Sequence, residues 1–161
     1  MRVVYLDTNV YSRPFDDQTQ ADIQAEANAF IEIMAEVKKG RLMLLCSDIL
    51  EFEVNNILSA EKCAKVCEYL SLCAEHIDNT EALLTVGKHI QSDCSIRARD
   101  ALHVASAMVG NAEYFLSCDK HVIKARQREC YRRITKSYCQ GSFTVLNPAV
   151  FVEKMQRGEL K

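Results

Sequence analysis

Short apolar segments that alternate with helical patterns constrain the fold of this chain more than any other feature of its sequence. Four β-rich runs are clear, at residues 3–6, 42–46, 114–116 and 143–146, and a weaker one lies at residues 75–77. Helical spacing of apolar residues separates most of them, and this alternation is typical of parallel sheets. The sequence therefore predicts an α/β fold with a central, doubly wound parallel sheet flanked by helices.

Amphipathic helices are expected between these strands. The longest covers residues 20–39 and can stop at Gly40. Ser47 can cap a helix after the second strand, and Pro148 can open a terminal helix. Other helical patterns cover residues 60–72, 81–91 and 98–109. No linker interrupts the pattern, so we expect one domain over residues 1–161.

Length and composition place the chain among ordinary globular proteins. It has 161 residues, of which 48% are hydrophobic and 26% charged. No apolar run approaches the roughly 20 residues that cross a bilayer. Asp7 places a carboxylate where a signal peptide would need its apolar stretch. We expect a soluble, cytoplasmic protein without membrane association. The net charge of −2 predicts that any contact with nucleic acid is local.

Eight cysteines raise the question of disulfides or a metal. Without a secretory signal, reduced thiols are the expectation. Cys63 and Cys67 are one helical turn apart, with Cys73 beyond, so a metal clip is conceivable there. Zinc motifs use a cysteine pair separated by two residues and a second pair or histidine, which this spacing does not match. Helix packing explains these residues more simply.

Two aspartates lie directly after predicted strands. Asp7 follows the run at residues 3–6, and Asp119 follows the run at residues 114–116 across Ser117 and Cys118. Open parallel sheets place ligand sites beyond the carboxyl ends of their strands. Both carboxylates are therefore expected at one edge of the sheet.

Two further acids are expected near that edge. Glu53 falls in the first two turns after the strand at residues 42–46, and a helix rises only about 1.5 Å per residue. Asp100 lies near the start of an alanine-rich helix, where a buried charge is costly unless a cation neutralises it. Four converging carboxylates would repel one another without such a cation. Hard oxygen ligands of this kind select Mg²⁺ or Mn²⁺ over zinc.

Each acid also has a simpler explanation when it is taken alone. The two aspartates that follow strands could cap a turn or a helix. Glu53 could be a solvated helix residue. Asp100 could pair with Arg97 or Arg99. The combination of all four is what favours a metal site.

Four short motifs follow one another along the chain. They read LDTNV at residues 6–10, SDILEFEV at 47–54, DALHVASA at 100–107 and FLSCDK at 115–120. Their order and spacing resemble those of the PIN-domain nucleases, and VLNP at residues 145–148 is similar to the family's ending. The resemblance spans nearly the whole chain. About two dozen residues between the last acid and the final strand depart from the compact members, among them Cys130, Tyr131, Arg132, Arg133 and Cys139.

The resemblance implies a metal-dependent endoribonuclease with an RNA substrate, often the toxin of a toxin–antitoxin pair. Its partners would then be an antitoxin protein and, because members commonly pair, a second copy in a homodimer. The residues that match the family's catalytic and metal-binding acids are Asp7, Glu53, Asp100 and Asp119. Asn9 and Ser117 match positions that orient these carboxylates. Glu51 competes with Glu53 for its role, and the spacing from Ser47 favours Glu53.

Two other readings of the function remain open from the sequence. The chain could be a PIN-like scaffold that binds RNA or protein without cutting, or it could hydrolyse a small molecule or a DNA flap. His103 is expected to be a buried, hydrogen-bonded histidine rather than a ligand. Lys120 and His121 could touch a phosphate, but they are expected to be solvated helix residues. The basic stretch at residues 124–136 is interpreted as a solvated helix face or a phosphate-contacting patch.

Overall fold

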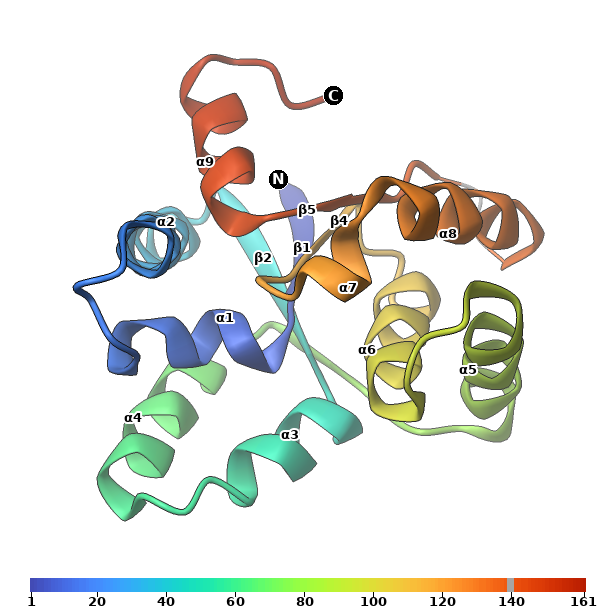
Figure 1. Ribbon diagram of the computed structural model, residues 1–161, viewed down its shortest axis with the longest axis horizontal. Helices are drawn as coiled ribbons and strands as arrows, with labels where there is room; N and C mark the ends of the chain where they lie inside the picture. Colours follow the sequence, from blue (N-terminus) through green and yellow to red (C-terminus); the bar gives the residue numbers. More distant parts are fainter. Residues whose placement is uncertain (139–140) are drawn as a thin grey trace.

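A parallel sheet forms the centre of the molecule. The computed structural model describes residues 1–138 and 141–161, so Cys139 lies outside the described residues. Within that part of the chain, five strands pair in the order β3-β2-β1-β4-β5; Figure 1 labels four of them, β1, β2, β4 and β5. The strands are β1 (Arg2–Leu6), β2 (Leu42–Ser47), β3 (Glu75–Ile77), β4 (Tyr114–Leu116) and β5 (Thr144–Leu146). All pairings are parallel, and the order reverses at β1. The predicted doubly wound α/β fold is confirmed.

Helices connect the strands largely where the sequence predicts them. They are α1 (Thr8–Ser12), α2 (Ala21–Lys38), α3 (Asp48–Asn55), α4 (Ala60–Leu70), α5 (Glu81–Cys94), α6 (Ala98–Val109), α7 (Lys120–Ile123), α8 (Ala125–Tyr138) and α9 (Pro148–Gln156), with a 3₁₀ turn η1 at Arg13–Phe15. Ser47 caps α3 by accepting a hydrogen bond from the amide of Leu50. Helix α1 and η1 were not predicted, because five and three residues are too few to show helical periodicity.

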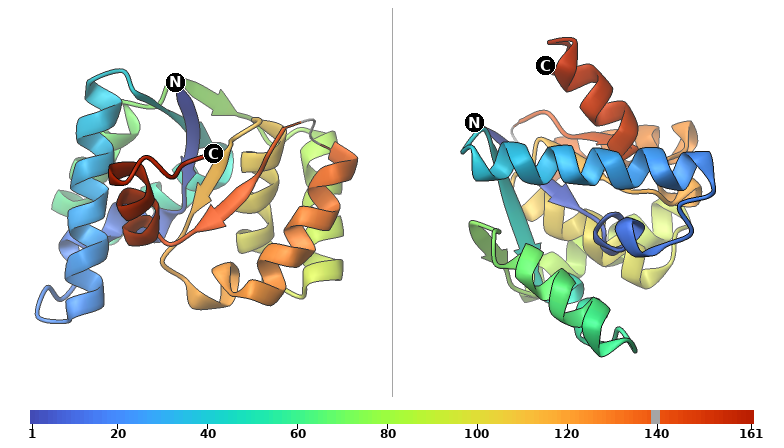
Figure 2. Two further views of the ribbon diagram at one scale, coloured as in Figure 1. Left: turned by 90° about the horizontal axis from the view of Figure 1, so that it is seen from above. Right: turned by 90° about the vertical axis from the view of Figure 1, so that its left-hand side faces the viewer.

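The two faces of the sheet carry separate apolar cores. Successive strand residues point to opposite faces: Val4 and Leu6 join one core, and Tyr5 joins the other. The first core packs under α1, α2, α3, α4 and α9, and the second packs under α5, α6, α7 and α8 (Figure 2). Helices therefore cover both faces and leave the carboxyl ends of the strands as the open edge.

One cysteine pair corrects the expectation of reduced thiols. Cys94 on α5 and Cys130 on α8 form a disulfide, with Cα atoms 5.7 Å apart. Helices α5 and α8 pack side by side, a neighbourhood that cysteine spacing alone does not reveal. The thiol of Cys63 donates to the carbonyl of Val54 at 3.4 Å, and Cys67 is exposed. Neither belongs to a metal-ligand cluster among the described residues.

The described residues contain no helix that is both long and apolar enough to span a bilayer.

Candidate functional site

The carboxylate of Asp7 is the most constrained group at the open edge of the sheet. Asp7 is 4% exposed, and its amide continues the sheet by donating to the carbonyl of Leu116 at 2.9 Å. Its Oδ1 accepts from the amide of Thr8 at 2.7 Å, and its Oδ2 accepts from Ser117 Oγ at 2.8 Å and Asn9 Nδ2 at 3.2 Å. Hydrogen bonds of this kind hold a buried carboxylate in one orientation.

Asn9 and Ser117 join the ends of the two central strands. The hydroxyl of Ser117 also accepts from Asn9 Nδ2 and from the amide of Asp119, each at 3.1 Å. Asn9 Oδ1 accepts from the amide of Cys118 at 2.9 Å. Both side chains therefore contact Asp7 and the turn that carries Asp119, which is the kind of contact that the expected supporting role requires.

Glu53 reaches the same edge from α3. Its Oε1 accepts from the hydroxyl of Thr8 at 2.6 Å and lies 2.5 Å from His103 Nε2. Burial acts to raise the pKa of Glu53, but the hydrogen bonds from His103 and Thr8 outweigh it, so the pKa lies below its ordinary value. Glu53 is therefore held as a carboxylate.

His103 is buried and hydrogen-bonded, as expected. It is 1% exposed, and its Nδ1 lies 2.7 Å from the hydroxyl of Tyr5, which in turn lies 2.6 Å from Ser47 Oγ. Its Nε2 faces Glu53 and lies 3.6 Å from Asp7 Oδ1. Burial acts to lower the pKa of His103, but the charges of Asp7 and Glu53 raise it above the ordinary value. This imidazole positions the Glu53 carboxylate beside Asp7.

Asp100 and Asp119 complete the acidic group. Asp100 lies in the first turn of α6, and Asp119 caps α7 by accepting from the amide of His121 at 2.9 Å. Burial raises the pKa of Asp100, and the nearby charges of Asp7 and Asp119 raise it further. The structure therefore brings these three carboxylates within electrostatic reach of one another.

A hollow opens beside three of these carboxylates. Asp7, Glu53 and Asp100 line a pocket of about 440 Å³ together with Thr8 and Arg99. Asp100 also lines a second pocket of about 320 Å³ with Arg97, which reaches the start of α7 and α8. Asp100 thus lines both hollows.

Two arginines lie over the acids from the solvent side. Arg97 Nε is 3.6 Å from Asp100 Oδ2, and its Nη2 is 3.8 Å from Asp119 Oδ2. Arg99 Nη1 is 3.9 Å from Glu53 Oε2. Both arginine side chains are highly exposed, at 81% and 64%, so these are surface ion pairs of small energy. The pairing of Asp100 with a neighbouring arginine therefore occurs, and Asp100, Asp119 and Glu53 stay partly exposed.

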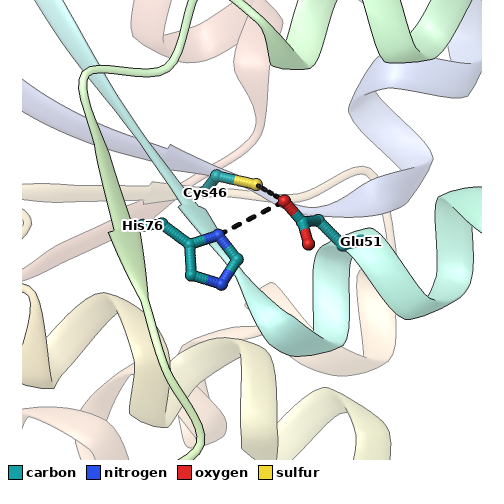
Figure 3. A group of neighbouring side chains, drawn as sticks. All are labelled: Cys46, Glu51 and His76. Atoms are coloured by element: carbon teal, nitrogen blue, oxygen red, sulfur yellow. Dashed lines mark hydrogen bonds and ion pairs between the residues drawn. The ribbon is translucent and has the colours of Figure 1, made fainter.

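Glu51 faces away from the acidic site. Its Oε1 lies 3.4 Å from His76 Nδ1 and 3.9 Å from Cys46 Sγ (Figure 3). Residues two apart on a helix are rotated by about 200° about its axis and point in nearly opposite directions. Glu51 and Glu53 therefore contact different surroundings. The preference for Glu53 agrees with this geometry.

The basic residues after Asp119 are exposed. Lys120 and His121 are exposed on α7, and Arg126, Arg128, Arg132 and Arg133 are exposed on α8. Arg132 pairs with Glu129 on the same helix at 2.9 Å. These contacts match a solvated helix face, and the phosphate-contacting alternative stays a prediction.

Three features of the site were missed from the sequence. They are the Thr8 hydroxyl on Glu53, the contact of Arg97 with Asp119, and the Tyr5–Ser47–His103 chain. Only the first had a signal, because Thr8 directly follows Asp7. The others join residues distant in sequence, and their meeting depends on the packing of α6 against the sheet.

This fold is similar to that of a solved structure. It is the crystal structure of VapBC2 from Rickettsia felis bound to a DNA fragment from their promoter. The match has a TM-score of 0.52 and 14% sequence identity, and it covers 89% of this chain and 98% of that chain. The likeness is one of fold. No family model and no curated protein sequence matches the chain.

Proposed function

We propose that this protein is a metal-dependent endoribonuclease that hydrolyses RNA phosphodiester bonds. The observation that carries the proposal is the gathering of Asp7, Glu53, Asp100 and Asp119 at the carboxyl edge of a parallel sheet. This edge is where α/β folds bind their ligands. The resemblance of the surrounding motifs to PIN-domain nucleases points to the same chemistry.

The donor set fits Mg²⁺ or Mn²⁺. Its members are carboxylate oxygens, the ligands that hard divalent cations prefer. The pKa of Asp100 is raised by burial and by the charges of Asp7 and Asp119, and a cation between these groups would relieve that repulsion. Asp7, Glu53, Asp100 and Asp119 would hold the ion.

The remaining residues of the site orient the ligands and the substrate. When bound, the cation would supply Lewis-acid chemistry, activating water for attack on phosphorus and neutralising charge on the phosphate oxygens. Ser117 and Asn9 hold Asp7 in place, while His103 and Thr8 hold Glu53. Arg97 and Arg99 are exposed at the rim, where they can contact the RNA backbone.

We further propose that the chain is the toxin of a toxin–antitoxin pair. The fold likeness to VapBC2, which was crystallised as a complex on promoter DNA, supports this role. The expected partner is an antitoxin protein. Homodimer formation stays a prediction from the family resemblance.

A cleavage assay with labelled, unstructured RNA oligonucleotides tests the activity. Cleavage should require Mg²⁺ or Mn²⁺ and stop in EDTA. Asp7→Asn and Asp100→Asn should each lower the rate by at least about 100-fold, and Ser117→Ala by about 10–100-fold, the usual effect of losing an outer-shell partner. Glu32→Gln, an exposed carboxylate on α2, is the matched control and should leave the rate unchanged. If Asp7→Asn and Asp100→Asn cleave the RNA as fast as the wild-type protein does, the proposal is wrong.

A non-catalytic PIN-like scaffold is the second candidate. The ion pairs of Arg97 with Asp100 and Asp119 favour it, because they neutralise part of the acidic charge without a metal. A scaffold would bind RNA or a protein partner equally well in EDTA and in Mn²⁺. Binding of a non-hydrolysable RNA that strengthens with Mn²⁺ and weakens in Asp7→Asn would exclude it.

A further inference from the structure

A second cluster of metal-ligating side chains lies on the β3 side of the sheet and shares no residue with the acidic site. Cys46 comes from β2, His76 from β3 and Glu51 from α3 (Figure 3). Cys46 and His76 are register partners in the parallel pairing of the two strands, so their side chains share one face. The three potential ligand atoms all lie within 4.8 Å of one another.

The separations of these atoms suit a tetrahedral ion. Cys46 Sγ lies 3.9 Å from Glu51 Oε1, and His76 Nδ1 lies 3.4 Å from the same oxygen. Zinc bonds of about 2.3 Å to sulfur and about 2.0–2.1 Å to nitrogen or oxygen require ligand separations of about 3.6 Å for S···O and about 3.3 Å for N···O. These two separations differ from those of a bound site by a few tenths of an ångström.

His76 is held in the orientation that metal-binding histidines adopt. Its Nε2 lies 2.6 Å from Asp48 Oδ1, and Asp48 Oδ2 accepts from the amide of Asn79 at 2.7 Å. A ligating histidine commonly donates its other ring N–H to a carboxylate in this way. When Nε2 donates to Asp48, the lone pair of Nδ1 faces the Glu51 carboxylate. Two acceptors then face each other, and a cation between them resolves the conflict.

The chemistry of the cluster differs from that of the acidic site. It combines a thiol, an imidazole and a carboxylate, a set that selects zinc over magnesium or manganese. Cys46 is buried at 4% exposure. His76 and Glu51 are partly open to solvent, so an ion can enter.

We propose that Cys46, Glu51 and His76 form a Zn²⁺ site that fastens β3 to β2 and α3. Strand β3 has three residues and pairs only with β2, at the edge of the described sheet. Such a short edge strand gains little from its own hydrogen bonds. A ligand from each of three elements would fix its position. Without a metal, His76 would be protonated, and its imidazolium would pair with Asp48, Glu51 and Asp78 instead.

Cobalt substitution tests the site in the full-length chain after treatment with a chelator. Wild-type protein should develop a sulfur-to-cobalt charge-transfer band in the near ultraviolet that saturates at one Co²⁺ per chain and disappears on addition of Zn²⁺. Cys46→Ser should abolish the band. His76→Ala and Glu51→Gln should each weaken Co²⁺ binding by at least about tenfold, and Asp48→Asn by about 10–100-fold.

Two controls separate this site from others. Cys67→Ser removes an exposed thiol, and Asp7→Asn disrupts the acidic site; both should keep the band and its midpoint. Because Cys46 is buried and its variant could fail to fold, Glu51→Gln, on a side chain that is 52% exposed, provides the decisive comparison. Absence of the band in wild-type protein, or a band with an unchanged midpoint in Glu51→Gln and His76→Ala, would overturn the proposal.

Discussion

Asp100 is a carboxylate whose charged form the surrounding structure disfavours. Burial, Asp7 and Asp119 all disfavour its charged form. In metal-free protein, Asp100→Asn should therefore raise the free energy of unfolding by about 0.5–2 kcal/mol, the usual gain from a single stabilising substitution. Urea unfolding in EDTA measures this, with Glu32→Gln as the matched control that should change little.

The same variant should lose its response to metal. Mn²⁺ at about 100 times its dissociation constant would stabilise the wild-type protein by about 2.7 kcal/mol through linkage. Asp100→Asn should lose most of this gain, because it lacks one of the carboxylates that hold the ion. If Mn²⁺ stabilises both proteins equally, the ion binds elsewhere.

Single residues of the site were predictable where they follow a strand or cap a helix. Asp7 and Asp119 lie one and three residues beyond β1 and β4, and parallel topology brings such positions together. The choice of Glu53 over Glu51 agrees with the structure because helical rotation separates two residues by about half a turn. The cluster of Cys46 with His76 was missed, since it depends on which strands become neighbours.

At the scale of elements, the approach of α6 to the sheet depends on Gly110. A Cβ at this position would lie 2.7 Å from Leu45 Cδ1 and 2.9 Å from Ile77 Cδ1. The Gly110 backbone has φ −77°, so alanine is strained there by space alone. We expect Gly110→Ala to lower the free energy of unfolding by about 1–3 kcal/mol, the usual cost of overpacking.

Gly141 offers the matched control for this substitution. A Cβ there would meet nothing within 4 Å, so Gly141→Ala should change stability by no more than about 0.5 kcal/mol. Thermal and urea unfolding of the two variants make the comparison. If Gly110→Ala and Gly141→Ala are equally stable, α6 can move away from β2 and β3 at little cost in free energy.

The elements themselves were largely predictable because most are long or strongly patterned. Helix α6 begins and ends where its alanine-rich pattern does. Helix α5 runs three residues beyond its expected end at Gln91, and α4 ends two residues before Leu72. Helix ends depend on local capping and packing that apolar spacing does not encode.

At the scale of the whole molecule, the disulfide ties two helices of the second core together. It closes a separation of 36 residues between Cys94 and Cys130. A loop of that length should contribute about 3–4 kcal/mol by restricting the unfolded chain. Replacing both cysteines by serine should lower the free energy of unfolding by about that amount, measured by urea denaturation.

Reduction provides an independent check on the same bond. Dithiothreitol should destabilise the wild-type protein to the level of the double serine variant and leave that variant unchanged. A wild-type protein that is indifferent to the reductant would show that its cysteines are reduced before treatment. In that case the original expectation of free thiols would hold for this pair as well.

The hydroxyl of Ser117 anchors the acidic site to the centre of the sheet. It contacts Asp7, Asn9 and the amide of Asp119 at the ends of β1 and β4, two strands that are neighbours at the centre of the sheet. Fraying of a surface loop cannot separate these groups, because the backbone that carries them is the middle of the sheet itself. Amide hydrogens around Asp7 should therefore exchange with solvent only when the entire domain opens.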